Sequence, residues 1–105
     1  MRNSTSLSQG DLYRLVQTIP RGKVTSYGWL GQALGISPRL VGRFLHQNPD
    51  SSLTPCHRVV RSDGSLASGY AFGGLDVQRQ LLEQEGVRFV KNRVVKTDFV
   101  SMLKK

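Results

Sequence analysis

Residues 26–49 read SYGWLGQALGISPRLVGRFLHQNP, and this stretch holds the start and stop signals of two short helices. Ser26 can cap the first helix, and Gly35 stands where a helix end favours a left-handed residue. Ser37 can cap the second helix with Pro38 at its first position. Two short helices joined by a turn that contains glycine predict a helix-turn-helix over this segment.

The second of these helices carries the basic side chains. Arg39, Arg43 and His46 fall on one side of it, and its apolar residues fall on another. In most helix-turn-helix proteins the second helix contacts the nucleic acid. The basic side therefore makes this helix the candidate recognition helix.

The rest of the chain predicts an α+β domain, mainly helical and winged-helix-like, with short strands around the helix-turn-helix. Asp-Gly in the turn at 62–65 and Lys-Asn between two β-branched runs mark reversals of the chain. The expected elements are a helix that starts near Ser8 and ends before Pro20, a short strand over Pro55–Val60, a helix from a cap at Asp76 to Glu85, and a hairpin of 87–90 with 93–95.

Length and charge narrow the classes of function. A chain of 105 residues predicts a single domain over 1–105. Fifteen Lys and Arg against seven Asp and Glu give a net charge of +8. Eight of the basic residues but only two of the acidic ones lie at or before Arg61. This surplus favours a polyanionic partner on the first part of the chain, although a basic face kept for solubility is the alternative.

Nothing in the sequence predicts export or a membrane partner. No apolar run approaches the roughly 20 residues of a membrane span, and residues 1–10 form no apolar signal core. The single cysteine excludes an intramolecular disulfide and suits a reducing compartment. We therefore expect a cytoplasmic or nuclear protein.

Cys56 is either a small buried hydrophobe or a nucleophile. His57 and Arg58 follow it directly, and their positive charge would favour the thiolate. Neighbours on a strand point to opposite faces, so a tight turn after Pro55 or a bridging water is needed to join thiol and imidazole. The acid that would orient His57 must come from elsewhere in the chain. A structural histidine bonded to the backbone is the alternative for His57.

Pro55-Cys56-His57-Arg58-Val59 resembles the active-site signature of the O6-alkylguanine-DNA alkyltransferases, or methylated-DNA–protein-cysteine methyltransferases. The resemblance covers about residues 12–95. Further segments match in the same order, namely Arg21–Tyr27, Arg39–Gly42, Asn48-Pro49, Gly64–Leu66, Gly69-Tyr70 and Leu81–Gly86.

The resemblance implies a chemistry and its residues. Cys56 would accept the alkyl group, His57 would draw the thiol proton through a water, and Glu85 would orient His57. Tyr27 would push the target nucleotide round and meet the flipped guanine, and Asn48 would tie the recognition helix to the active-site loop. No cofactor and no metal are implied, and one turnover ends the reaction.

The same resemblance implies the contacts with double-stranded DNA that contains O6-alkylguanine. Arg39 would fill the gap left in the base stack, although a plain phosphate contact is its alternative, as side-chain packing is for Tyr27. The backbone carbonyls of Cys56 and Val59 would receive the guanine amine. The expected DNA-binding residues are Arg39, Tyr27, Thr25, Ser26 and Arg43, and the expected pocket residues are Val59, Tyr70, Pro55 and Arg58.

Two departures from the family pattern keep a rival function open. The family's N-terminal domain is expected to be absent, as in the short alkyltransferase-like proteins, which bind alkylguanine without transfer. Those proteins replace the acceptor cysteine, so Cys56 favours transfer. The loop at 65–73 is about one residue longer than the pattern, which leaves the alignment of Tyr70 open. A plain regulatory helix-turn-helix is the second rival, and a monomer is expected throughout.

Overall fold

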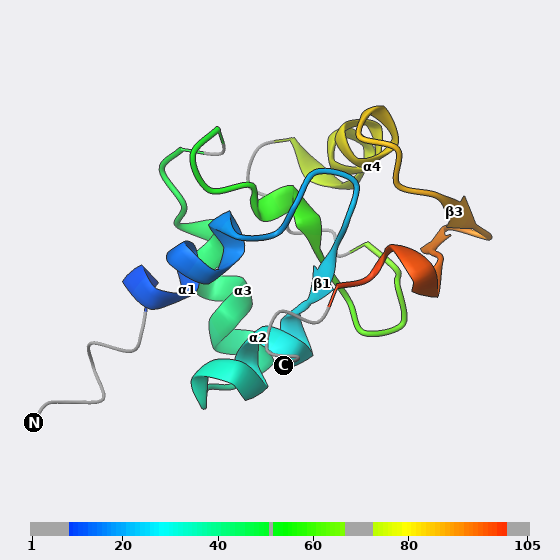
Figure 1. Cartoon of the computed structure of the whole chain (residues 1–105). Coiled ribbons are helices and arrows are strands. Elements are labelled where there is room, and N and C mark those ends of the chain that lie inside the picture. Colours follow the sequence, from blue (N-terminus) through cyan, green and yellow to red (C-terminus); the bar gives the residue numbers. More distant parts are fainter. Residues whose placement is uncertain (1–8, 51, 67–72, 101–105) are drawn as a thin grey trace, which may run out of the picture.

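The computed structural model describes residues 9–50, 52–66 and 73–100 (Figure 1). Among these residues no helix is long and apolar enough to cross a membrane. The helices are α1 (Gln9–Gln17), α2 (Tyr27–Leu34), α3 (Pro38–His46) and α4 (Gly74–Gln84), with 3-10 turns η2 (Cys56–Arg58) and η3 (Lys96–Asp98). The strands are β1 (Thr25–Ser26), β2 (Val59–Val60), β3 (Phe89–Val90) and β4 (Arg93–Val94).

The predicted helix-turn-helix is confirmed in α2 and α3. The Ser26 hydroxyl accepts a hydrogen bond from the amide of Trp29, which caps α2. Gly35 ends α2 at a φ of 72°, and Ser37 caps α3 through the amide of Leu40. These caps satisfy amides that the first turn of a helix leaves without partners.

The chain that follows α2 passes so close to Gly31 of α2 that only glycine fits at this position. A Cβ at Gly31 would lie 2.5 Å from the backbone oxygen of Ile36. No side chain fits there unless the backbone moves. Glycine at position 31 thus permits α2 and α3 to cross closely. This crossing fixes the orientation of α3 relative to α2.

Two apolar clusters hold the domain together. Helices α1, α2 and α3 enclose the first cluster, and β1, β2, α4 and the β3–β4 hairpin surround the second. Strand β1 runs parallel to β2, with Thr25 opposite Val59 and Ser26 opposite Val60. This short pairing joins the start of α2 to the segment that carries Cys56. The buried residues are Leu12, Val16, Ile19, Leu30, Val41, Leu45, Cys56 and Val59 in the first cluster and Val24, Val60, Leu82, Val87 and Val94 in the second.

The predicted strand over Pro55–Val60 is wrong in its first part. Cys56–Arg58 form the 3-10 turn η2, and only Val59 and Val60 are extended. Two i to i+3 bonds close the turn, from the Arg58 amide to the Pro55 oxygen and from the Val59 amide to the Cys56 oxygen. The β-branched residues that favour a strand begin only at Val59.

Other boundaries differ by about a turn or less. Helix α1 ends at Gln17, and its expected cap at Ser8 lies outside the described residues. Helix α4 begins at Gly74 rather than after Asp76, which lies in the first turn and not at the cap. The predicted hairpin is confirmed, and its turn residues Lys91 and Asn92 both have positive φ. This is the backbone of a type I′ turn.

Candidate active site

Cys56 lies at the start of η2 with its side chain buried, at 4% exposure. Asn48, just beyond the end of α3, donates through Nδ2 to the Thr54 oxygen at 2.9 Å and to the Cys56 Sγ at 3.4 Å. Its own Oδ1 accepts from the amide of Asp50 at 3.2 Å. One buried side chain thus connects α3, the loop after it and the thiol.

The Cys56 thiol is protonated at rest. Burial raises the pKa of Cys56 and outweighs the opposing hydrogen bond from Asn48. The expected help from neighbouring positive charge does not arise. Burial lowers the pKa of His57, so its imidazole is neutral near pH 7, and the Arg58 guanidinium is paired with Glu85. A base must therefore remove the proton when the thiol reacts.

His57, Arg58 and Glu85 form one buried cluster. His57 Nε2 lies 2.8 Å from Glu85 Oε2, and Arg58 binds both carboxylate oxygens, each at 2.9 Å. Burial alone would raise the pKa of Glu85, but the hydrogen bonds from Arg58 and His57 outweigh it and lower that pKa. An ionised Glu85 accepts a hydrogen bond from Nε2–H, which leaves Nδ1 as the ring nitrogen that can take a proton.

Gln78 on α4 is the buried residue that the sequence did not single out. Its Nε2 donates to the backbone oxygens of His57 at 3.0 Å and Val59 at 3.1 Å. Among the described residues, its Oε1 has no hydrogen-bond partner. Gln78 therefore spans η2 and fixes the turn that presents Cys56. The sequence could not indicate this role, because a single glutamine inside an amphipathic helix does not show which backbone oxygens it will bind.

Gln78→Met is expected to lower the free energy of unfolding by about 1–3 kcal/mol, because it removes the donors to two backbone oxygens while keeping a similar volume. Chemical denaturation measures the change. Gln80→Met on the exposed side of α4 is the matched control. Equal stability of the two variants would show that Gln78 does not hold the turn.

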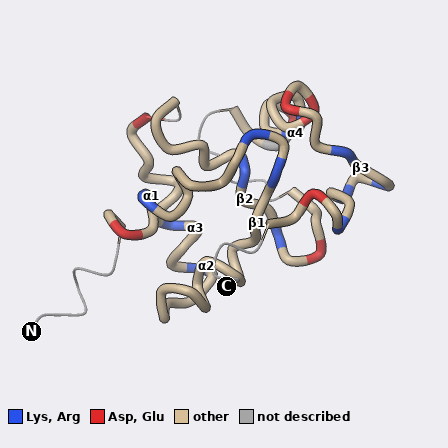
Figure 2. The backbone as a smooth tube through the Cα atoms, viewed as in Figure 1, with Lys and Arg blue, Asp and Glu red and all other residues tan. Residues whose placement is uncertain are grey.

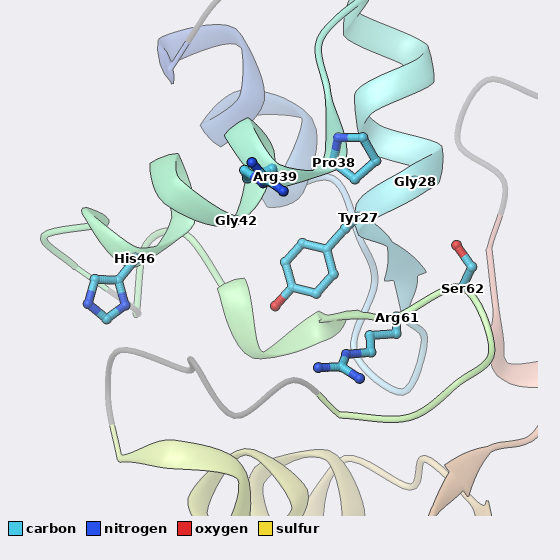
Figure 3. Close-up of a pocket in the computed structure, with 8 residues that line it drawn as sticks. All are labelled: Tyr27, Gly28, Pro38, Arg39, Gly42, His46, Arg61 and Ser62. Carbon is cyan, nitrogen blue, oxygen red and sulfur yellow. The ribbon is translucent and has the colours of Figure 1, made fainter.

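A cavity of about 570 Å³ lies between α2, α3 and the chain after β2 (Figure 3). Tyr27 extends into it from the start of α2, and Arg39 stands at its α3 wall. Its size suits a flat organic ring system with its substituents. Its lining residues are Tyr27, Gly28, Pro38, Arg39, Gly42, His46, Arg61 and Ser62.

The surface around the cavity is basic. Helices α2 and α3 carry no acidic residue, whereas several of the Asp and Glu residues lie on α4 and the turn after β2 (Figure 2). Arg39 and Arg43 are both exposed on α3. Helix α3 thus presents positive charge with no carboxylate of its own to neutralise it.

Some of the residues that were expected to bind DNA or to line the pocket do not lie at the cavity. Thr25 and Ser26 are buried in the pairing of β1 with β2, so neither presents its side chain at the surface. Arg58 does not line the cavity, because its guanidinium is held by Glu85 and by the Ile19 oxygen at 2.8 Å. Each of these side chains already serves a contact within the domain.

The remaining expected pocket residues are only partly accessible. Pro55 and Val59 are buried, and the Val59 oxygen already accepts from Gln78. The Cys56 oxygen accepts from the Val59 amide. A carbonyl oxygen has two lone pairs, so each can still accept a second donor. Tyr70 lies outside the described residues. Arg61 and Ser62, which line the cavity, carry no sequence signal beyond following β2.

The chain combines a helix-turn-helix, a buried cysteine that is bound by Asn48, and a histidine–glutamate pair that begins at the next residue. The family described as "6-O-methylguanine DNA methyltransferase, DNA binding domain" matches residues 8–87, and the chain belongs to this family. The methylated-DNA–protein-cysteine methyltransferase of Pyrobaculum aerophilum is 52% identical over 68 residues, which are 65% of this chain and 45% of that protein. That of Thermococcus kodakarensis is 45% identical over 74 residues, covering 70% and 41%.

Solved structures show the same fold. S. pombe Atl1 in complex with damaged DNA containing O6-carboxymethylguanine matches with a TM-score of 0.71 at 30% identity, covering 86% of this chain and 83% of that one. The O6-methylguanine-DNA methyltransferase of Pyrococcus kodakaraensis matches with a TM-score of 0.67 at 40% identity, covering 75% and 46%. The chain spans less than half the length of the curated relatives given above.

Proposed function

We propose that this domain repairs DNA by moving an alkyl group from O6 of guanine in double-stranded DNA to Sγ of Cys56. The observation that carries the proposal is the buried Cys56 beside a histidine whose Nε2 is bound by Glu85. Tyr27 packs against the cluster that holds Cys56, and with Arg39 it also walls the cavity. The named methyltransferase relatives support this reaction.

The chemistry is a single displacement. His57 Nδ1 takes the thiol proton through a water, and the sulfur attacks the alkyl carbon. The carbon–O6 bond breaks, its electron pair stays on the oxygen, and a proton restores neutral guanine. The product is a thioether on Cys56, which leaves poorly, so each molecule acts once. The reaction as proposed uses no cofactor.

The alkylated oxygen lies inside the duplex, so the base must leave the stack first. Unstacking costs a few kcal/mol, which an inserted side chain can offset in part. Arg39 is exposed at the edge of the cavity and can stack or hydrogen-bond to the orphaned base. Tyr27 on the facing wall would press against the rotated nucleotide. A protein with this function works in the cytoplasm or nucleus, as a monomer in our proposal.

A second candidate is a protein that binds alkylguanine and transfers nothing. The similarity to Atl1 over 83% of that chain favours it. Intact mass after incubation with duplex containing O6-methylguanine separates the two candidates. A gain of one methyl group supports transfer, and binding without a mass gain supports the second candidate.

The affinity for DNA is expected to fall steeply with salt, because a partner surface without carboxylates neutralises several phosphates. Neutralising about four phosphates predicts a slope of log K against log salt near −4. Titration of a labelled duplex at several salt concentrations measures this slope. Little change of affinity between low and moderate salt would argue against DNA as the partner.

Arg39→Ala is expected to slow repair of duplex DNA by about tenfold or more, which corresponds to about 1.4 kcal/mol, and to leave reaction with free O6-benzylguanine unchanged. The free base has no stack to fill. Arg14→Ala, which removes an exposed arginine of α1, is the matched control. A similar loss on both substrates would assign Arg39 a role in stability instead.

A further inference from the structure

The wall of the cavity that faces α3 is formed by Arg61 and Ser62, directly after β2. The backbone of Arg61 is fixed on both sides. Its amide donates to the Ser65 oxygen at 3.0 Å, and its oxygen accepts from the Gly64 amide at 2.8 Å. The side chain therefore leaves a rigid turn. Figure 3 shows its guanidinium extending into the same space as the Tyr27 ring.

Within the described part of the chain, none of the ion pairs includes Arg61. The nearest carboxylate in sequence, Asp63, accepts its hydrogen bonds from the Ser65 hydroxyl at 2.6 Å and the Ser65 amide at 2.9 Å. The charge of Arg61 contributes less than these bonds to the lowered pKa of Asp63. The described residues that line the cavity include no carboxylate. Burial is the main cause that raises the pKa of Tyr27, and the charge of Arg61 opposes that rise. The two side chains are therefore close enough to interact electrostatically.

We propose that Arg61 forms an anion subsite inside this cavity, which binds an oxyanion of the substrate while the flipped guanine lies against Tyr27. A guanidinium offers paired donors that match carboxylate and phosphate oxygens. Arg39 is directed to the base stack in the proposed function, which leaves Arg61 as the arginine that faces the bound nucleotide. The subsite rests on that proposed function.

Two oxyanions of the substrate can accept the paired hydrogen bonds of a guanidinium. One is the phosphate beside the flipped nucleotide, and the other is a carboxylate on the alkyl group itself. Four substrates distinguish them, namely duplexes with O6-methylguanine or O6-carboxymethylguanine and the two corresponding free deoxynucleosides, which have no phosphate. The variants are Arg61→Ala and Arg61→Lys, with Arg14→Ala as the control for loss of one exposed arginine. The rate of mass gain at Cys56 and the affinity for each duplex are measured.

If Arg61 binds the phosphate, Arg61→Ala lowers rate and affinity on both duplexes by about tenfold, as expected for one charge-assisted contact, and leaves both deoxynucleosides unchanged. If Arg61 binds the alkyl carboxylate, only the two carboxymethyl substrates lose about tenfold. Arg61→Lys retains part of either effect, because it keeps the charge without the paired donors.

Either pattern supports the subsite, and two results would overturn it. One is an unchanged rate and affinity on all four substrates. The other is an equal loss on all four with a lowered melting temperature, which assigns Arg61 to stability. A wild-type protein that gains no mass from any substrate would refute alkyl transfer. The affinities of wild type and Arg61→Ala for the two duplexes would then still decide the subsite.

Discussion

Cys56→Ala is expected to abolish the mass gain from O6-methylguanine duplex and to leave the affinity for that duplex nearly unchanged. The chain has no other cysteine to take the group. The proposed contacts to DNA come from the cavity wall and the exposed side of α3, which the substitution does not touch. The loss of a small buried side chain costs about 1 kcal/mol of stability, too little to unfold a typical domain.

Intact mass and a binding titration on the same samples measure both halves of this result. Cys56→Ser is the closer control, because a hydroxyl keeps the shape and can still accept from Asn48. A wild-type protein that binds the duplex but never gains a methyl mass would contradict the transfer. Cys56 would then be a buried residue of the first apolar cluster.

The helix-turn-helix was predictable because its signals are local. Ser26 caps α2 and Ser37 caps α3, each through an amide three residues ahead. Gly35 provides the left-handed end of α2. Each signal acts within one turn of the helix it bounds, so the sequence alone contains it.

The sequence offered a tight turn after Pro55 only as an alternative to a bridging water, because distant residues hold η2. Gln78 on α4 binds the backbone oxygens of His57 and Val59, which lie 21 and 19 residues away. Asn48 contacts both Thr54 and Cys56 from the end of α3. Local propensity favours a strand at Val59 and Val60, and the prediction extended that strand too far toward Pro55.

The pKa values and charges in the site also depend on contacts between residues that are far apart in the sequence. Two neighbouring basic residues predicted a favoured thiolate at Cys56, whereas burial raises the pKa of the thiol. The sequence could not show that Arg58 would turn away to Glu85, 27 residues further along. Resemblance to the family indicated Glu85 as the partner of His57, and the structure places the two in contact at 2.8 Å.

Glu85→Ala is expected to lower the free energy of unfolding by about 3–5 kcal/mol, because it leaves the Arg58 guanidinium without its carboxylate in a largely buried place. The Glu85 side chain is 7% exposed. Transfer should slow as well, since His57 loses the group that fixes its tautomer. It should slow less than in Cys56→Ala, because a small thiolate fraction persists near neutral pH.

Glu83→Ala is the matched control on the same helix. Glu83 is 51% exposed and pairs with Arg79 on the surface, so its removal is expected to cost no more than about 0.5 kcal/mol. Denaturant unfolding of both variants measures the difference. Equal costs would show that the cluster around Glu85 contributes no more than a surface pair.

The same two variants, Glu85→Ala and Glu83→Ala, test how the stability of the protein depends on pH. The pKa of Glu85 is lower in the folded protein than its usual value, so its contribution to stability is complete above the unfolded pKa. That contribution is lost as pH falls through the lowered pKa of the folded state. The stability difference between wild type and Glu85→Ala should therefore shrink on acidification, while Glu83→Ala should follow wild type. A difference that stays constant down to acidic pH would mean that the charge of Glu85 does not stabilise the cluster.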